Sequence, residues 1–350
     1  MVPHSKPSLD DRELEKIIEI YKTGNISVGY EIEIFEKKIA DYIGKKYAIA
    51  TSSGTTALHL LLYGMDIKES DEVIIPASVC PGVMHAIEYT GAIPVISDIN
   101  QQDFNISVEY VKKLITTNTK LIIIPHMFGL PSDIDELKNL NIPIIEDCAQ
   151  SIGAEYKGKK VGCFGEASIF SFYATKMFTS IDGGMILTDN EKLAIKLKDL
   201  RYYGGKRDYK LRFNYKMQNI NAAVGLIQFE KLKYFLNERK RLYNEYLKKF
   251  TKLQWIKILN ISDSPKKVSS NYRFIIKIDN DKKEFFLNLC KKYGIILGDT
   301  IFEDLSTFAP KYFKEKLLNT QNLIISTYSF PLYPNIDENI LENFFKELLL

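Results

Sequence analysis

The chain has 350 residues, of which 45% are hydrophobic and 26% are charged, and its formal net charge at pH 7 is +3. A chain of this length and composition can bury a large core and commonly forms two lobes, and so small a net charge gives no support for nucleic-acid binding. The four cysteines are scattered and form no Cys-x-x-Cys unit, so the sequence predicts neither a zinc site nor a disulfide framework.

Short apolar runs, separated by longer helix-like segments, occupy the first part of the chain. The predicted strands, in chain order, cover residues 47–50, 73–76, 94–97, 121–124 and 142–145. The segments between them are long enough for crossover connections. This spacing is typical of an α/β fold in which a mostly parallel sheet lies between layers of helices.

The first predicted strand leads into a turn rich in hydroxyls, with Gly54 and Thr55 at its centre, and an apolar helix follows from residue 57. Glycine permits close approach of the backbone, hydroxyl groups donate hydrogen bonds, and the amino end of a helix favours an anion. The turn is therefore a candidate phosphate site. Turns of this kind are often ordinary helix N-caps, so the turn alone leaves both interpretations open.

Two charged residues further along the chain stand in unusual surroundings. Asp147 follows the predicted strand 142–145, and open α/β sheets place ligand contacts at the carboxyl ends of their strands. Lys176 follows the β-prone run 167–172 and precedes a double glycine at 183–184 that leads into another apolar strand. We therefore place Lys176 on a tight turn between two strands of the core, where a merely solubilising charge is not expected.

The pattern changes after about residue 230. Residues 231–250 are charged with one apolar stripe, which predicts a helix that leads out of the first domain. A strand at 272–278, a helix at 282–293 and a terminal amphipathic helix at 340–350 follow. We expect a large domain at residues 1–235 and a smaller C-terminal α+β domain at residues 236–350.

Lys176 and Asp147 together indicate one kind of chemistry. A lysine amine forms Schiff bases with carbonyl groups, and pyridoxal phosphate enzymes pair such a lysine with a carboxylate that keeps the pyridine nitrogen of the cofactor protonated. The turn at 53–55 would hold the phosphate of the same cofactor. The three pieces, in this order along the chain, predict a pyridoxal 5'-phosphate site.

With further blocks, the chain resembles a known family, the DegT/StrS-type pyridoxal-phosphate-dependent sugar aminotransferases of the aspartate aminotransferase-like (fold type I) superfamily. The blocks that carry the resemblance are Ser-Gly-Thr at 53–55, His-Met-Phe-Gly at 126–129, Glu-Asp-Cys-Ala-Gln at 146–150, Ser-Phe-Tyr-Ala-Thr-Lys at 171–176, Gly-Gly at 204–205 and Phe-Asn-Tyr-Lys-Met at 213–217. The resemblance runs along most of the chain and is weakest from about residue 251 onward.

The resemblance implies a role for each matching residue. Lys176 would bind the cofactor covalently and shuttle the proton, Asp147 would pair with the pyridine nitrogen, and Gln150 would contact the ring near its hydroxyl. The residues expected at the phosphate are Gly54, Thr55 and Ser171 of the same chain and Asn214 of the neighbouring subunit. The expected assembly is thus a homodimer with a shared active site.

Two positions and one stretch depart from the family's common pattern. Cys80 stands where many members carry an aromatic residue stacked on the pyridine ring; a cysteine packs there but cannot stack. His85 is a second candidate to cover the ring, with an ordinary structural histidine as the alternative. Lys216 stands where arginine is usual, and it lacks the planar fork that holds a carboxylate or phosphate by two hydrogen bonds. The stretch 298–304 lacks the histidine-containing loop expected near the acceptor.

The resemblance implies transfer of an amino group, with glutamate as the expected donor, to the 3- or 4-keto group of a nucleotide-linked deoxy sugar. A smaller keto sugar phosphate stays open as the acceptor, because the region that shapes the acceptor pocket matches the family least well. Relatives that dehydrate a keto-deoxy sugar carry histidine in place of the lysine, so Lys176 argues against that activity. A non-enzymatic cofactor-binding regulator is the last alternative; it would need an added module, for which we expect no spare length.

Two further features bear on partners and location. The basic run at 206–212 is either a contact for a diphosphate group or a solvated loop. No apolar run approaches the roughly 18 residues that span a bilayer, and the polar first residues form no signal core. We therefore expect a cytoplasmic protein without a membrane partner.

Overall fold

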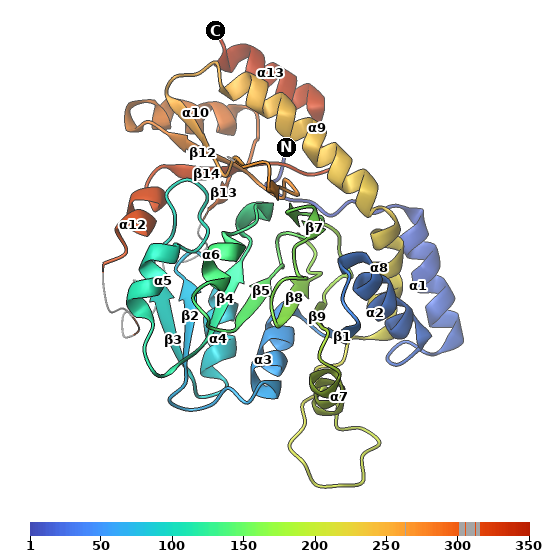
Figure 1. Cartoon of the computed structure of the whole chain (residues 1–350). Helices are drawn as coiled ribbons and strands as arrows, with labels where there is room; N and C mark the ends of the chain where they lie inside the picture. Colours follow the sequence, from blue (N-terminus) through green and yellow to red (C-terminus); the bar gives the residue numbers. More distant parts are fainter. Residues whose placement is uncertain (263, 301–304, 306–311, 313–315) are drawn as a thin grey trace.

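Seven strands form one sheet through the middle of the larger lobe (Figure 1). Across the sheet the strands are β1 (Tyr47–Thr51), β9 (Gly184–Thr188), β8 (Ala167–Ser171), β5 (Ile144–Asp147), β4 (Thr119–Pro125), β2 (Glu72–Pro76) and β3 (Ile93–Ser97). Neighbouring strands from β8 to β3 are parallel, whereas β9 is antiparallel to both β1 and β8. The predicted mostly parallel sheet is confirmed. This computed structural model describes residues 1–262, 264–300, 305, 312 and 316–350.

Helices cover both faces of the sheet because its strands are apolar on both sides. In β4, Ile122 and Ile124 belong to the core on one face and Leu121 and Ile123 to the core on the other, and all four are fully buried. The helices on the first face are α2 (Tyr30–Ile43), α5 (Val108–Leu114), α6 (Ile134–Lys138) and α8 (Asn219–Glu230). Those on the second face are α3 (Gly54–Gly64), α4 (Pro81–Glu88) and α7 (Glu191–Leu200), while α1 (Asp11–Thr23) packs on α8.

The smaller lobe, at the top of Figure 1, contains a four-stranded antiparallel sheet. Its strands, in spatial order, are β10 (Ile256–Leu259), β12 (Phe274–Ile278), β14 (Thr327–Phe330) and β13 (Gly298–Asp299). The helices α9 (Leu232–Phe250), α10 (Asn280–Lys292) and α13 (Glu338–Leu348) share a core with it that is rich in aromatic rings. Tyr246 and Phe330, for example, meet edge to face with their centroids 5.1 Å apart. The predicted C-terminal helices and strand are therefore present, displaced by at most two residues at either end.

The two cores meet along the single helix α9. Phe235 packs in the core of the larger lobe, and Leu242, two turns later, packs in the core of the smaller one. Val2 is buried in the smaller lobe and pairs with Ile295, so the first residues lie with the last third of the chain. The domain division after residue 235 stays a prediction.

Two further elements connect the lobes. A short sheet joins β11 (Lys267–Val268) to β6 (Glu155–Tyr156) and β7 (Lys159–Lys160). Asp98, just after β3, accepts hydrogen bonds from the Asn319 and Thr320 N–H groups at the start of α12 (Leu318–Ile324). Of the acceptor-side stretch 298–304, residues 301–304 lie outside the described residues. In the part of the chain that the structure describes, no helix is both long enough and apolar enough to cross a lipid bilayer.

Candidate active site

A cavity of about 280 Å³ lies where the carboxyl ends of β5 and β8 meet the amino ends of α3 and α4. The predicted site residues that line it are Gly54, Thr55, Cys80, Asp147, Ser171 and Lys176. A second hollow of similar volume, about 270 Å³, lies between α9 and α13, but its walls combine apolar side chains with exposed surface charges. Only the first of these two brings a buried carboxylate and an amine together.

Asp147 is the last residue of β5, and only 8% of it is exposed. Its Oδ1 accepts a hydrogen bond of 2.9 Å from the Ala149 N–H. Burial raises the pKa of Asp147, while the Ala149 N–H and the positive charge of Lys176 act against that rise. A cationic group bound in the cavity would therefore stabilise the ionised carboxylate.

Lys176 lies on the turn that joins β8 to β9, as the sequence predicts. The base of the turn is braced, because the Phe172 N–H donates to Gly183 O at 2.8 Å and Thr179 Oγ1 donates to Phe172 O at 3.1 Å. The rings of Phe172 and Phe178 stack against each other with centroids 5.0 Å apart. The turn is thus a packed support that presents Lys176 to the cavity.

The turn before α3 leaves its first amide groups available. Ser53 caps the helix, since its Oγ accepts from the Thr56 N–H at 3.1 Å while Thr56 Oγ1 accepts from the Ser53 N–H at 2.9 Å. Among the described residues, no hydrogen bond engages the N–H groups of Gly54 and Thr55, and both residues line the cavity. Two such amides at the positive end of a helix favour an anion such as a phosphate group.

We call the backbone of residues 53–55, with the amides of Gly54 and Thr55, the phosphate cradle. Two glycines allow this cradle to pack against the lysine-bearing turn. A Cβ on Gly54 would lie 2.9 Å from Ser171 Cβ, and a Cβ on Gly184 would lie 2.7 Å from the Gly54 nitrogen and closer still to the Ser53 carbonyl. Gly184 pairs with Thr51 on one side and with Ser171 on the other. Strand β9 therefore joins the cradle to the lysine turn with no room for a methyl group between them.

Cys80 is the N-cap of α4, and its exposed side chain lines the cavity next to Val83. A Cβ on Gly82 would lie 2.8 Å from Thr55 Oγ1, so α4 begins in close contact with the start of α3. His85, the other candidate to cover a ring, is not a lining residue, and its Nδ1 lies 3.1 Å from Glu88 Oε2. The geometry thus favours Cys80 over His85 as the residue that would cover a bound ring.

Gln150 and Asn214 do not line the cavity and have local partners of their own. The Phe128 N–H donates to Gln150 Oε1 at 3.2 Å, so Gln150 supports the 3-10 turn η1 (Met127–Gly129), in which Phe128 has a positive φ of 56°. Asn214 is exposed, and its Oδ1 lies 3.4 Å from Lys216 Nζ. The contacts predicted for both residues with the cofactor stay predictions.

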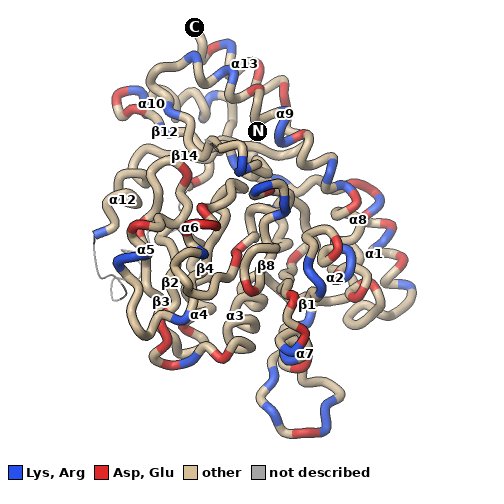
Figure 2. Tube along the Cα trace, viewed as in Figure 1, with Lys and Arg blue, Asp and Glu red and all other residues tan. Residues whose placement is uncertain are grey.

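The basic run at 206–212 forms a loop that extends below α7 (Figure 2). Lys206, Lys210 and Arg212 all pair with Asp199, and Arg212 pairs with Asp208 as well. Much of the positive charge of the loop is therefore balanced by acids beside it. This balance favours a solvated loop over a diphosphate contact.

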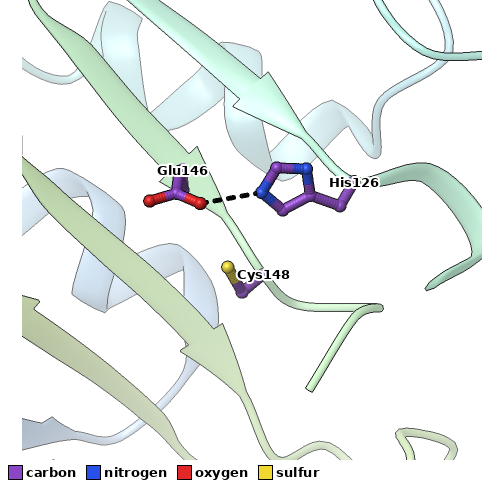
Figure 3. A group of neighbouring side chains, drawn as sticks. All are labelled: His126, Glu146 and Cys148. Atoms are coloured by element: carbon purple, nitrogen blue, oxygen red, sulfur yellow. Dashed lines mark hydrogen bonds and ion pairs between the residues drawn. The ribbon is translucent and has the colours of Figure 1, made fainter. Parts of the chain in front are cut away.

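Three buried side chains next to the site, His126, Glu146 and Cys148, have potential metal-ligand atoms within 4.8 Å of one another (Figure 3). His126 Nδ1 accepts the Ser132 N–H at 3.1 Å, so its Nε2 carries the ring hydrogen and donates to Glu146 Oε2 at 3.0 Å. Burial raises the pKa of the Cys148 thiol well above its ordinary value. The histidine therefore has no free lone pair and the thiol keeps its proton, so the group is not suited to a metal ion.

Glu146 instead acts as a structural clamp. Besides His126, its carboxylate accepts hydrogen bonds from the backbone N–H groups of Gly162 at 2.7 Å, Phe164 at 2.6 Å and Gly165 at 2.8 Å. Burial raises its pKa, but these donors more than offset the effect, and the pKa of Glu146 lies below its ordinary value. Sequence reasoning missed this role, although a signal was present: neighbouring residues in a strand point to opposite faces, so Glu146 and Asp147 cannot both face one ligand.

Tyr272 is a second residue whose contact next to the site the sequence did not reveal. Its hydroxyl donates to Thr175 O at 3.0 Å, directly before Lys176, although the two partners are 97 residues apart in the chain. Tyr272 lies just before β12 of the smaller lobe, but its side chain packs in the core of the larger lobe, and no local pattern links it to the lysine turn. The contact forms only because the two lobes pack against each other.

The cavity as a whole fits a cofactor with a carbonyl group, a basic ring nitrogen and a phosphate. Lys176 offers an amine to the carbonyl, and Asp147 offers a buried carboxylate to the protonated ring nitrogen. Gly54 and Thr55 offer backbone amides to the phosphate, and Ser171 adds a hydroxyl. Pyridoxal 5'-phosphate has all three groups.

Comparison with known sequences agrees with this geometry. A model of the DegT/DnrJ/EryC1/StrS aminotransferase family matches residues 7–348. An uncharacterized protein of Methanocaldococcus jannaschii is 32% identical over 369 residues, which cover 97% of this chain and 95% of that protein. The GDP-perosamine synthase of Caulobacter vibrioides is 40% identical over 257 residues, which cover 71% of this chain and 69% of that enzyme.

Solved structures show the same fold. DesV of S. venezuelae, determined in complex with a ketimine intermediate, is 26% identical with a TM-score of 0.89, over 99% of this chain and 98% of DesV. The aminotransferase TlmJ of Streptoalloteichus hindustanus superposes with a TM-score of 0.93 at 21% identity, over 99% of this chain and 98% of TlmJ. A proposed sugar aminotransferase of Streptococcus pneumoniae, solved in its PLP form, has a TM-score of 0.89 at 23% identity, over 100% and 99% of the two chains.

Proposed function

This chain belongs to the DegT/DnrJ/EryC1/StrS aminotransferase family and is a pyridoxal-phosphate-dependent sugar aminotransferase, and we propose that it moves an amino group from glutamate to the 3- or 4-keto group of a nucleotide-linked deoxy sugar. The observation that carries this proposal is that Lys176 and Asp147 line one cavity beside a cradle for a phosphate group. The bound cofactor supplies the electron sink that amino transfer requires. A cytoplasmic location stays a prediction.

In this proposal Lys176 is the catalytic residue. Its amine would bind the carbonyl group of the cofactor and, when free, would move a proton within the site. The braced turn between β8 and β9 limits the positions that the amine can take. Asp147 would keep the ring nitrogen protonated, and this ion pair would offset the cost of burying the carboxylate.

The remaining predicted residues are proposed to fix the cofactor. Gly54, Thr55 and Ser171 hold the phosphate, and Cys80 packs against one face of the ring. Gln150, whose side chain accepts the Phe128 N–H in this structure, would contact the ring near its hydroxyl. Asn214, which is exposed in the single chain, contacts the phosphate of a second copy in a homodimer. A shared site of this kind makes the dimer the active form.

The proposed acceptor rests on the relatives. GDP-perosamine synthases from Caulobacter vibrioides and Escherichia coli O157:H7 are 40% and 37% identical to this chain over 257 and 262 residues, and their names specify a sugar carried on a nucleotide. The resemblance drawn from the sequence implies that relatives which dehydrate a keto-deoxy sugar carry histidine in place of the lysine, so Lys176 favours amino transfer over dehydration. A smaller keto sugar phosphate is the competing acceptor for the experiment to exclude.

The test is a pair of half-reactions followed separately. The purified protein with pyridoxal phosphate is mixed with glutamate and its visible spectrum is recorded; we expect the band of the lysine-bound cofactor to disappear and 2-oxoglutarate to form. Nucleotide-linked keto-deoxy sugars and keto sugar phosphates are then added in parallel, and the aminated product is identified by mass spectrometry. Lys176→Ala should abolish both steps, whereas Lys240→Ala, a change of an exposed lysine on α9, should leave them intact.

Each alternative has its own outcome. Amination of sugar phosphates alone would replace the nucleotide-linked acceptor. Loss of water from a keto-deoxy sugar without transfer from glutamate would indicate a dehydratase. A cofactor that binds but reacts with no amino donor would contradict the proposed enzyme and leave the binding role of a regulator.

A further inference from the structure

Tyr272 brings the smaller lobe into direct contact with the lysine turn. It lies just before β12, it is almost completely buried, and its hydroxyl donates to Thr175 O at 3.0 Å. That carbonyl belongs to the peptide bond that leads into Lys176. A shift of this carbonyl would move the backbone of the lysine itself.

The Tyr272 ring and its backbone are held by two arginines, Arg239 on α9 and Arg273 next to it in the chain. The guanidinium carbons of Arg239 and Arg273 lie 5.6 Å and 5.0 Å from the ring centroid. Arg239, which is buried on α9, also donates to Tyr272 O at 3.0 Å. The tyrosine is therefore a rigid strut between α9 and the lysine turn.

One glycine of the larger lobe, Gly129, leaves room for Tyr272. A Cβ on Gly129 would lie 3.0 Å from the Tyr272 nitrogen and 3.2 Å from Tyr272 Cβ, and Gly129 already has a positive φ of 92°. The Ser270 N–H donates to Gly129 O at 3.0 Å. The 3-10 turn η1, which Gln150 supports, thus packs against the segment that carries Tyr272.

We propose that Tyr272 is a positioning residue for Lys176: by holding the Thr175 carbonyl it fixes the direction in which the lysine amine enters the cavity. This inference rests on the proposed aminotransferase function, in which Lys176 is the reacting amine. The contact also makes the geometry of Lys176 dependent on how the smaller lobe packs on the larger one.

The charges around Tyr272 make its hydrogen bond to Thr175 O dependent on pH. Burial raises the pKa of its hydroxyl, but the positive charges of Arg273, Lys176 and Arg239 outweigh burial and lower the pKa to about 8. These cations come from its own segment, from the lysine turn and from α9; His4, which contacts Arg273, is neutral because burial and the two arginines lower its pKa to about 3. An ionised hydroxyl cannot donate to Thr175 O, so the support of Lys176 is lost as pH rises through this value.

The test compares Tyr272→Phe with Tyr246→Phe, a change of an equally buried tyrosine in the core of the smaller lobe. Loss of one hydrogen bond predicts that Tyr272→Phe lowers kcat for the glutamate half-reaction by about fivefold with KM nearly unchanged. We expect kcat of the wild type to decline at alkaline pH, and we expect no such decline in this variant. Arg273→Gln, which keeps the hydroxyl and removes one cation, should move that decline to higher pH.

A measurement without cofactor completes the test. Amide hydrogen exchange of the segment 172–180 in the cofactor-free protein should become at least several-fold faster in Tyr272→Phe and stay unchanged in Tyr246→Phe. Unchanged exchange together with a wild-type kcat and pH profile in Tyr272→Phe would overturn the inference. A wild-type protein that fails to react with glutamate would instead contradict the proposed function, and the exchange result would still decide whether Tyr272 holds the turn.

Discussion

Glu146 and Asp147 are consecutive residues of β5, yet their carboxylates act on opposite faces of the sheet. Asp147 lines the cavity, whereas Glu146 is clamped by His126 and the backbone amides of residues 162–165. Their pKa values are accordingly shifted in opposite directions, upward for Asp147 and downward for Glu146. In the proposed function Asp147 serves the reaction, whereas Glu146 serves the fold, and mutation can separate these two roles.

Glu146→Gln should destabilise the protein without a change in cofactor chemistry. The amide NH₂ group would face backbone N–H donors that now meet a carboxylate, which leaves buried donors unsatisfied and costs about 2–4 kcal/mol. The free energy of unfolding, measured by urea denaturation of the cofactor-free protein, should fall by this amount. The remaining folded protein should still react with glutamate.

The same carboxylate makes stability depend on pH. Because the pKa of Glu146 is lower in the folded state than its ordinary value of 4.5, its ionised form contributes stability that is present above that value and is lost as pH falls towards the folded pKa. The wild-type protein should therefore lose more stability between pH 7 and pH 4 than Glu146→Gln does. Equal losses in the two proteins would contradict this account.

Asp147→Asn should have the opposite effects, with stability retained and activity lost. The raised pKa of Asp147 means that its ionised form costs free energy in the cofactor-free protein, a cost that is absent at low pH and appears as pH rises above the ordinary value. The cofactor-free variant should thus be at least as stable as the wild type at pH 7. Its kcat should fall by two orders of magnitude or more, because nothing keeps the ring nitrogen protonated. A clear loss of stability in this variant would assign Asp147 a structural role.

Gly184→Ala should disrupt the phosphate cradle, and Gly183→Ala is the matched control. The new methyl group of Gly184→Ala would collide with the backbone of Ser53 and Gly54, whereas that of Gly183→Ala meets side-chain atoms of Met217 and Ser180, which have more freedom to move. We expect a destabilisation of about 3 kcal/mol or more for Gly184→Ala, the upper end of overpacking effects. Titration with pyridoxal phosphate should also show at least tenfold weaker binding for Gly184→Ala than for Gly183→Ala.

Cys80→Tyr should strengthen cofactor binding. The side chain is exposed at the start of α4 and already lines the cavity, so a ring has room to lie against the cofactor. Aromatic stacking of about 0.5–1.5 kcal/mol corresponds to a Kd about two- to tenfold lower. Cys80→Ser should leave the Kd near the wild-type value. Weaker binding of Cys80→Tyr would show that the ring lies elsewhere in the cavity.

The shared site is tested by mixing two inactive or impaired variants. Lys176→Ala lacks the reacting amine, and Asn214→Ala lacks the proposed contact with the phosphate of the neighbouring subunit. After the two are unfolded and refolded together, mixed dimers contain one site with both native residues, so about a quarter of the wild-type activity should return if subunits pair at random. Activity no higher than that of Asn214→Ala alone would place Asn214 outside the site of the second subunit.

Much of this fold is predictable because its signals are local. The apolar runs of β2 and β4 and the amphipathic helices α9 and α13 are visible as patterns of a few residues, and they appear close to their predicted ends. The insertion of β9 between β1 and β8 is different, since it depends on pairing between distant segments. Within the site, Lys176 and Asp147 are evident from their positions after strands. Tyr272 is not, because its only relation to Lys176 is a contact between two lobes.

The pairing of Gly184 with both Thr51 and Ser171 also has a consequence for the order of events during synthesis. The amides of Gly54 and Thr55 acquire their final surroundings only when β9 has inserted beside β1, and β9 ends at Thr188. A nascent chain that ends between Lys176 and Gly184 has the lysine and the serines but no completed cradle. Capture of the cofactor must therefore follow translation of roughly the first half of the chain and closure of a very long loop, a slow type of contact in folding.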